Sequence, residues 1–391
     1  MDRLKVLVVT NWYPTKEYPV RAVWVRELAK AAAIHDDVRV LHCAGPSRAL
    51  TIPWRIEQET EEELRDGVSV YRLLYRPGRI RQFRYLIYLR RMLGALRRII
   101  QDGFRPDIIH VHVYDAGGPA VLIGRLNHIP VVVSEHFSSF PRKSLRRLDI
   151  FKAWLAFRGA NLVLPVSQAL QKAIEDYGIR ARFQVIPNTA DTKLFSPSPT
   201  RDDAETKRLL FVGQLTTTKG IPHLLHALSH LRQKREDWQL DIVGDGDRRL
   251  EYERLAADLK LCDKVTFHGL KPKSQVAEFM RRAHLFVLSS LCETFSVPAI
   301  EALATGTPVL ATRCGGPEEF ITKEVGFLLP PDDEESLCQG VDYMLNNLHL
   351  YSSQRISQYA LERFSPEVVG AKLHAIYRCL NSGRPYPSVS R

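Results

Sequence analysis

Residues 288–308 read LSSLCETFSVPAIEALATGTP, and this stretch indicates how the second half of the chain folds. The apolar run Leu285–Leu288 is typical of a buried strand. A short loop then leads to a helix that we expect to begin near Phe295–Val297. Pro298 falls in the first turn of that helix, where its missing N–H is harmless. A strand, a loop and a helix in this order form the repeating unit of parallel α/β sheets.

The same alternation of short apolar runs and longer helical patterns continues outward through the 391 residues. The runs that predict strands are Val6–Val9, Val38–Leu41, Val68–Leu73, Ile108–Val113, Val131–Val133, Leu162–Val166, Gln184–Ile186, Leu209–Val212, Gln239–Val243, Lys264–His268, Leu285–Leu288, Val309–Ala311 and Gly326–Leu328. Helical patterns separate most of them, for example Val23–Ala33, Ile221–Lys234 and Ser274–Arg282. The pattern predicts an α/β protein with parallel sheets covered by helices.

The chain is long enough for two domains, and a turn-rich stretch over residues 188–203 marks their boundary. We expect an N-terminal domain over residues 1–195 and a C-terminal domain over residues 205–365. A last helix at about 366–382 would pack back on the first domain. Ligands of open parallel sheets bind beyond the carboxyl ends of the strands, so a cleft between two such domains is the expected site.

Composition predicts a soluble protein. Hydrophobic residues make up 45% of the chain and charged residues 25%, and no apolar run approaches the roughly 18 residues of a membrane-spanning helix. The N-terminus lacks the features of a signal peptide. No CxxC pair or metal-ligand spacing occurs among Cys43, Cys262, Cys292, Cys314, Cys338 and Cys379. We therefore expect free thiols in a reducing cytoplasm, and neither a metal site nor a cofactor.

The charge of the chain is uneven. Residues 1–190 contain 30 Lys and Arg against 18 Asp and Glu, so the net charge of +11 comes from this half. Arg84, Arg91 and Arg98 recur every seven residues of a helical pattern whose opposite, apolar face would contain Leu86, Leu89, Leu93, Leu96 and Ile100. Such a surface favours docking on an anionic membrane, although a domain helix with a basic outer face gives the same pattern. Nucleic acid is not expected, because no recognition motif accompanies the charge.

Two carboxylates lie near the predicted helix start in the opening stretch. Glu293 comes just before the helix and Glu301 lies eight positions later. A helix N-terminus offers free N–H groups to a diphosphate, and carboxylates accept hydrogen bonds from sugar hydroxyls. The structural alternative is that Glu293 aids the helix cap and Glu301 is a solvated helix position.

Other polar residues follow predicted strands. Lys219 comes after the strand over Leu209–Val212 and is suited to pair with a diphosphate, although it is equally explained as a surface lysine. Gly244 lies in a turn that resembles a phosphate-binding loop but lacks the full GxGxxG spacing. His136 follows Val131–Val133, and His112 ends another strand; each is explained as readily by a structural role.

These pieces together resemble glycosyltransferase family 4, a group with the GT-B fold of two Rossmann-like domains facing each other across a cleft. The resemblance covers nearly the whole chain and rests on the order and spacing of loose motifs, namely NWYPT, PVRAVWVRELAK, DIIHVH, SEH, PVS, VIPNTADTKLF, FVGQLTTTKG, IVGDG, VTFHG and the E-x7-E segment.

The resemblance implies roles for individual residues. Glu293 would contact the donor sugar, Glu301 the ribose, and Lys219 the diphosphate. Backbone amides at Phe295, Ser296 and Val297 would help with the diphosphate, Gly269 would flank the base, and His136 would lie by the transferred sugar. Two departures matter: Gln214 replaces the usual Arg of the donor site, and Ala22 stands near a usual Gly.

The resemblance implies a retaining, metal-independent transferase that moves a sugar from a UDP- or GDP-sugar to a glycan or lipid-linked acceptor. The opening segment and the SEHFSSF stretch resemble enzymes of bacterial cell-surface polysaccharide or glycolipid synthesis, which would place the protein in the cytoplasm, on the inner face of the cell membrane. His112 and the three arginines would lie on the acceptor side. A nucleotide-sugar epimerase and a non-catalytic nucleotide-sugar-binding protein stay open as alternatives, the latter because of Gln214.

Overall fold

The computed structural model of the protein describes residues 3–46, 51–59, 68–76, 83–198 and 205–383. The chain divides into two compact units, each with its own sheet and core. Unit 1 comprises Met1–Thr189 and Pro366–Arg391, and unit 2 comprises Ala190–Ser365. The C-terminal helix therefore belongs to the first unit, although the chain reaches it only after completing the second.

Unit 1 contains a seven-stranded sheet in the order β3-β4-β2-β1-β5-β6-β7. All neighbours in it are parallel except β3 and β4. Its strands are β1 (Lys5–Thr10), β2 (Asp37–Pro46), β3 (Trp54–Gln58), β4 (Ser69–Tyr75), β5 (Ile108–His112), β6 (Val131–Glu135) and β7 (Leu162–Pro165). Because the strands other than β3 run the same way, their carboxyl ends meet at one edge of the sheet.

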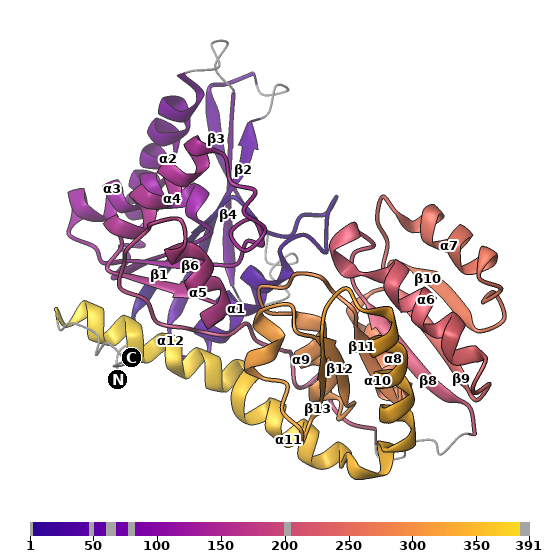
Figure 1. Cartoon of the computed structure of the whole chain (residues 1–391). Helices are drawn as coiled ribbons and strands as arrows, with labels where there is room; N and C mark the ends of the chain where they lie inside the picture. The colour runs from indigo at the N-terminus through magenta and orange to yellow at the C-terminus, as the bar shows by residue number, and fades with distance from the viewer. Residues whose placement is uncertain (1–2, 47–50, 60–67, 77–82, 199–204, 384–391) are drawn as a thin grey trace. The chain divides into compact units, whose positions relative to one another are not determined.

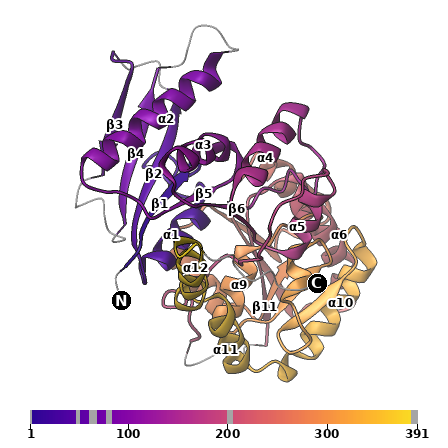
Figure 2. The ribbon, with the colours of Figure 1, turned by 90° about the vertical axis from the view of Figure 1, so that its left-hand side faces the viewer.

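Helices cover both faces of this sheet (Figures 1 and 2). They are α1 (Val23–Ala33), α2 (Arg84–Gln101), α3 (Gly117–Asn127), α4 (Arg147–Gly159), α5 (Gln168–Glu175) and α12 (Pro366–Asn381). Val6 and Val8 of β1 belong to the core formed with α1 and α12. Leu7 and Val9 face the opposite way, with Met92 of α2. The alternation along β1 thus supplies two cores, one on each face.

Helix α12 packs closely on α1 and lies beside it in both views of the ribbon. A Cβ atom added to Gly370 of α12 would lie 2.1 Å from the carbonyl oxygen of Ala31, so only glycine permits this approach. His374 Nδ1 lies 2.8 Å from the Asp36 carboxylate, and the Tyr377 hydroxyl lies 2.6 Å from Nδ1 of the buried His110. These contacts fasten the end of the chain to unit 1.

Unit 2 contains a six-stranded sheet in the order β10-β9-β8-β11-β12-β13, in which all neighbours are parallel. Its strands are β8 (Lys207–Val212), β9 (Trp238–Val243), β10 (Val265–Gly269), β11 (Leu285–Leu288), β12 (Val309–Thr312) and β13 (Gly326–Leu329). The helices are α6 (Ile221–Arg232), α7 (Arg249–Asp258), α8 (Lys273–Arg282), α9 (Val297–Ala304), α10 (Glu334–Asn346) and α11 (Ser353–Phe364). Helices α6, α7 and α10 pack into one core with alternate residues of β8, and α8 and α11 pack against α9.

One strand prediction was wrong, and one strand was missed. Gln184–Ile186 forms no strand; an isolated bridge joins Val163 to Phe183 instead, and the backbone N–H of Ile186 donates to Pro165 at the end of β7. Strand β3 was missed. It is a short antiparallel edge strand with mostly half-exposed and exposed residues, so it lacks the apolar run that marks the buried strands.

The apolar face predicted for α2 was also partly wrong. The helix buries Leu96 as predicted, but the other residues that it buries are Tyr88, Met92, Ala95 and Ile99. Leu86 is 53% exposed, because the helix packs along a neighbouring stripe on β4 and α3. Arg84 and Arg98 are exposed as expected, whereas Arg91 is half-buried. Arg79 and Arg81 of the same basic segment lie outside the described residues, as do residues 199–204 of the expected linker and residues 384–391 of the tail.

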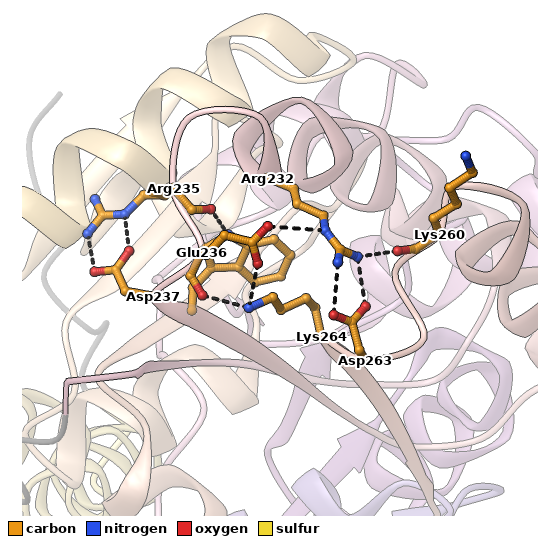
Figure 3. A network of polar contacts seen from close by, with 8 residues as sticks. Arg232, Arg235, Glu236, Asp237, Lys260, Asp263 and Lys264 are labelled. Carbon is orange, nitrogen blue, oxygen red and sulfur yellow. Dashed lines mark hydrogen bonds and ion pairs between the residues drawn. The ribbon is translucent and has the colours of Figure 1, made fainter.

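A polar network ties together the amino ends of β9 and β10 and the end of α6 (Figure 3). Arg235 binds both carboxylate oxygens of Asp237 at 2.7 Å and also reaches Asp342 at 3.0 Å and Asn346 at 2.9 Å. Nearby, Arg232 binds both carboxylate oxygens of Asp263 at 2.7 and 2.9 Å. The network lies at the edge of the sheet opposite the carboxyl ends of the strands, so it concerns stability and not the site described below.

We expect Arg235→Ala to lower the free energy of unfolding by about 1–2 kcal/mol, because its partly buried guanidinium holds Asp237 and α10 together. The Arg235 side chain holds the pKa of Asp237 below its ordinary value of 3.8. This stabilisation is therefore present at neutral pH and is lost as the pH falls through the lowered pKa. Urea unfolding at pH 7 and at pH 3 measures both effects. Arg248→Ala, which removes a more exposed arginine paired with Glu251, should leave stability unchanged; equal losses in the two variants would contradict the prediction.

Candidate functional site

The carboxyl ends of β8 and β11 bring a cation and a carboxylate together in unit 2. Lys219 ends the short 3-10 helix η3 (Thr217–Lys219) after β8, and Glu293 follows β11. The Lys219 ammonium lies 2.6 Å from Glu293 Oε1, which also accepts a hydrogen bond from the Ser290 hydroxyl at 2.7 Å. Both side chains are partly buried, with 23% and 11% exposed. Neighbouring parallel strands thus place two sequence-predicted residues, 74 positions apart, in direct contact.

The backbone holds Glu293 between β11 and the end of β12. Its N–H donates to the Cys314 carbonyl at 2.9 Å, and its own carbonyl accepts from the N–H of Gly316 at 3.0 Å. Cys314 packs beside this bridge, where burial, and secondarily the Glu293 charge, raises the pKa of its thiol to about 12. A thiol with such a pKa is neutral, so Cys314 acts here as a packing residue.

The turn after Lys219 requires glycine. Gly220 has a φ of 63°, and a Cβ atom on it would lie 2.0 Å from the Ser289 carbonyl oxygen. The Ser289 hydroxyl donates to the Lys219 carbonyl at 2.9 Å, and the N–H of Leu291 donates to Thr218 at 2.8 Å. This close approach of the two loops directs the Lys219 side chain past Gly213 toward Glu293.

Helix α9 begins directly after this loop. Ser296 precedes it with a φ of 82°, and its buried hydroxyl has no hydrogen-bond partner among the residues that the structure describes. The Phe295 side chain packs against Phe320 and Phe364 in the core, so only its backbone is available to a ligand. The unpaired N–H groups at the start of α9, near Ser296 and Val297, form the polar end that attracts an anion.

Glu301 lies apart from the Lys219–Glu293 pair in its contacts. It is 5% exposed on α9, and its Oε1 lies 3.5 Å from the ammonium of Lys273 at the start of α8. The structure therefore gives this carboxylate its own cation, which the sequence did not suggest.

The glycines predicted at the donor site bring three strand ends together. A Cβ atom on Gly244 would lie 1.9 Å from the Gly213 carbonyl oxygen, and the N–H of Gly244 donates to Gly269 at 3.0 Å. A guanidinium nitrogen of Arg249 lies next to Gly269, at the position a Cβ atom would crowd. Gln214, on the loop after β8, is exposed.

Three histidines form a buried group in unit 1. His136 Nε2 lies 3.2 Å from His112 Nδ1, and their rings stack at 5.4 Å; His110 Nε2 lies 2.8 Å from the Ser134 hydroxyl. Burial lowers the pKa of His110 and of His136 to about 3, and it also holds the pKa of His112 well below its ordinary value of 6.5. All three are therefore neutral at physiological pH. His112, predicted on the acceptor side, is fully buried within this group.

Glu135 precedes His136 and is fully buried. Its carboxylate accepts hydrogen bonds from the N–H groups of His136 and Phe137, both at 2.9 Å, and of Tyr114 at 3.0 Å. Burial nevertheless raises its pKa to about 7. Its contacts show that it fixes the turn that presents His136.

Ala22 occupies the position near which the resemblance implies Gly. It precedes α1 with a φ of 50° and is 2% exposed. The left-handed region costs a non-glycine residue about 1 kcal/mol, so alanine accepts strain where the backbone conformation favours glycine.

A cavity of about 1750 Å³ opens in unit 1 beyond the carboxyl ends of β1, β2 and β4, between the starts of α2 and α4. Its polar floor contains Asn11, Trp12, Tyr88 and Asp115. Tyr88 donates to Asn11 Oδ1 at 2.8 Å, and Trp12 Nε1 donates to Asp115 Oδ2 at 3.0 Å. Of the predicted acceptor-side residues, Arg84 lines this cavity.

Neither a metal-type cluster nor a membrane-spanning helix is found where the structure describes the chain. No three His, Cys, Asp or Glu side chains there are grouped so that they could hold a metal ion. None of its helices combines the length and the apolar character needed to cross a bilayer.

Two family models match successive parts of the chain, "Glycosyltransferase Family 4" over residues 22–194 and "Glycosyl transferases group 1" over residues 192–363. The putative teichuronic acid biosynthesis glycosyltransferase TuaC of Bacillus subtilis is 30% identical over 368 residues, which cover 86% of this chain and 88% of TuaC. The chain belongs to glycosyltransferase family 4.

Further comparisons agree with this glycosyltransferase family and with its fold. The putative colanic acid biosynthesis glycosyltransferase WcaL of Escherichia coli is 27% identical over 63% of this chain and 64% of its own length. Anabaena HepE, solved in complex with UDP, superposes with a TM-score of 0.76 at 21% identity, covering 96% of this chain and 100% of HepE. The expected GT-B fold of two Rossmann-like domains is thereby confirmed.

In this family 4 glycosyltransferase, sequence reasoning missed several residues at both candidate sites. Ser290, Lys273 and Arg249 contact predicted donor-site residues, yet single polar residues in loops and first turns carry no signal of their own. Trp12 and Asp115 line the cavity floor and lie within or just after the quoted motifs NWYPT and DIIHVH. The one signal in the sequence that could have identified Trp12 and Asp115 is that each residue follows shortly after a strand.

The buried histidines of the glycosyltransferase make its stability depend on pH. Unfolded His110 binds a proton below its ordinary pKa of 6.5, whereas the folded state does so only near pH 3, so stability falls as the pH drops between these values. We expect His110→Gln to reduce the slope of unfolding free energy against pH by about 1.4 kcal/mol per unit between pH 6 and 4. Urea titrations across this range measure it.

Glu135 contributes the opposite slope between its ordinary pKa of 4.5 and about 7, because the folded state holds the extra proton there. Because Glu135 is present in both the wild type and His110→Gln, its contribution cancels when the slopes of the two proteins are compared. Parallel stability curves for the two proteins would show that His110 already titrates normally in the folded state.

Proposed function

We propose that the protein is a retaining, metal-independent glycosyltransferase that moves a sugar from a UDP-sugar, or else a GDP-sugar, to a glycan or lipid-linked acceptor. The observation that carries the proposal is the Lys219–Glu293 pair at the carboxyl ends of β8 and β11, next to the start of α9. A cation and free helix amides can hold a diphosphate, and the adjoining carboxylate can accept a hydrogen bond from a sugar hydroxyl.

The proposed reaction breaks the bond between the anomeric carbon and the diphosphate and forms a bond from that carbon to an acceptor oxygen. Negative charge grows on the departing phosphate, and Lys219 and the start of α9 would stabilise it. The acceptor attacks from the same face, and its proton passes to the leaving phosphate, so the products are the glycosylated acceptor and a nucleoside diphosphate. No added metal or cofactor enters this scheme, in which the nucleotide sugar is a substrate.

Glu293 would serve two states in turn. Before the donor binds, its carboxylate neutralises Lys219 and fixes its direction. An ammonium group carries three N–H donors, so Lys219 can keep this bond while it binds phosphate. Glu301 would hold the ribose, with Lys273 to balance its charge. The loops that contain Gly244 and Gly269 would enclose the nucleotide.

His136 would lie by the transferred sugar as a neutral group. With a pKa of about 3 it carries no positive charge near pH 7, so it would act as a hydrogen-bonding partner and not as a general acid. This assignment leaves the departing phosphate as the proton acceptor.

Relatives support the choice of donor and pathway. HepE was solved with UDP and with UDP-glucose, which favours UDP over GDP in the proposal for this chain. TuaC and WcaL bear names from teichuronic and colanic acid synthesis, so we propose a role in building a bacterial cell-surface polysaccharide. That role would place the protein in the cytoplasm.

We expect the double variant Lys219→Ala, Glu301→Ala to lose about tenfold or more of its affinity for UDP, because each substitution removes a charged hydrogen-bonding partner. Isothermal titration calorimetry with UDP and GDP measures it. Gln214→Arg should instead tighten UDP binding by restoring the family's cation in an exposed position. Gln233→Arg adds the same charge at an exposed site in unit 2, at the end of α6, and should change nothing. Unaltered UDP affinity in the double variant would reject the proposed donor site.

Product analysis separates the three functions left open by the sequence. A glycosyltransferase consumes a UDP-sugar and releases UDP only when an acceptor is supplied, apart from slow hydrolysis. An epimerase converts the UDP-sugar without an acceptor, and a binding protein leaves it unchanged. Turnover across a panel of bacterial membrane extracts and UDP-sugars decides among them.

We also propose that the basic surface of unit 1 attaches the protein to anionic membranes. We define this surface by the exposed residues Arg84 and Arg98 of α2, Arg142, Lys143 and Arg146 of the segment before α4, and Arg147 at its start. Each such residue contributes about 1 kcal/mol to attraction by an anionic surface, and salt screens the effect. Lipid-linked acceptors would be reached from this position.

The double variant Arg84→Gln, Arg98→Gln should bind phosphatidylglycerol-containing vesicles about tenfold more weakly than wild type at low salt. Vesicle sedimentation measures this. Arg248→Gln, Arg363→Gln removes the same charge from unit 2 and serves as the control. Equal sedimentation of wild type with neutral and anionic vesicles would contradict membrane attachment.

A further inference from the structure

The large cavity of unit 1 has walls of two kinds. Its floor is polar and aromatic, and one wall is formed by α4. We infer that this cavity binds an acceptor in which a sugar is joined to a hydrocarbon chain, with the sugar on the floor and the chain against α4. The inference rests on the proposed function in treating the ligand as the acceptor, and it narrows the acceptor class to lipid-linked sugars.

The floor offers polar contacts that sugar hydroxyls use. The Arg21 guanidinium covers one face of the Trp12 ring, 4.4 Å from its centroid, and Trp12 Nε1 holds the Asp115 carboxylate in place at 3.0 Å. Burial raises the pKa of Asp115, and its Oδ1 meets no hydrogen-bond donor among the described residues. A sugar hydroxyl on the floor would supply the missing donor after a small rotation of the carboxylate.

Apart from Lys152, the α4 side chains that line the cavity are apolar. Leu148, Phe151 and Leu155 line the cavity and lie on one side of the helix at a spacing of three and four residues. They are 63%, 55% and 38% exposed. The ring of Trp154 stacks on Phe151 with centroids 6.1 Å apart and is itself 38% exposed, so the apolar surface continues beyond the cavity. A water-soluble glycan would leave these side chains in water, whereas a hydrocarbon chain would cover them.

Size and charge agree with an amphipathic ligand. The volume of about 1750 Å³ exceeds the roughly 300–1,000 Å³ typical of pockets for small ligands, so a sugar and part of a chain fit together. Acids and bases both line the cavity, and Arg72 is already bonded to His42, Pro14 and Glu59. The lining therefore does not select a highly charged ligand. The exposed basic residues at the start of α4 adjoin the apolar wall, as expected for a surface that meets lipid headgroups.

The test uses methyl, butyl and octyl β-D-glucoside as probes on the full chain, each below the concentration at which it forms micelles. Affinity measured by calorimetry should rise at least about tenfold from methyl to octyl glucoside, because each added CH2 that is buried strengthens binding. The variant Leu148→Ser, Phe151→Ser should remove most of this gain and leave methyl glucoside unaffected. Asp115→Asn should weaken all three probes by a similar factor, since it alters the floor alone.

Leu126→Ser is the matched control. Leu126 is 65% exposed on α3 and does not line the cavity, so its loss should leave the chain-length gain intact. A flat series in the wild type, or a gain that survives the α4 substitutions, would overturn the inference. UDP affinity measured on the same samples distinguishes the two proposals: normal UDP binding with a flat series rejects only the lipid-linked acceptor, whereas absent UDP binding rejects the proposed function.

Discussion

The contact between the loop after β8 and the loop after β11 is the constraint on which the candidate donor site depends. Gly220 passes so close to the Ser289 carbonyl that no side chain fits, and this approach fixes the direction of Lys219. Glu293 is fixed in turn by backbone bonds to Cys314 and Gly316 at the end of β12. Three parallel strand ends therefore hold one ion pair, and the pair is in place before any ligand binds.

Unit 1 holds neutral histidines at its strand ends, in contrast to the charged Lys219–Glu293 pair of unit 2. There the histidines at the ends of β5 and β6 are buried and neutral, and they are held by hydrogen bonds to one another, to Ser134 and to Tyr377 of α12. The last helix of the chain thus completes the surroundings of residues laid down much earlier. A neutral, rigid group suits hydrogen bonding to a sugar, whereas unit 2 retains full charges that suit a phosphate.

The cavity of unit 1 unites features that the sequence placed far apart. The motif NWYPT supplies its floor after β1, the segment after DIIHVH supplies Asp115, and α4 supplies an apolar wall. The exposed apolar residues of α4 would be a solubility cost without a partner. A lipid-linked acceptor would explain all three features: its sugar would contact the floor, its hydrocarbon chain would cover the α4 wall, and the basic surface would face the lipid headgroups.

The sequence by itself determined the strand–helix alternation and the residues Lys219 and Glu293 that meet at the strand ends, because buried parallel strands are apolar runs and their carboxyl ends share one edge. Only the tertiary structure decided which face α2 buries, that Glu301 pairs with Lys273, and that the His112 ring stacks on that of His136. It also revealed β3, a polar edge strand that gave no signal of its own. These outcomes depend on packing between segments distant in the chain, and local residue patterns do not encode which partner a side chain meets.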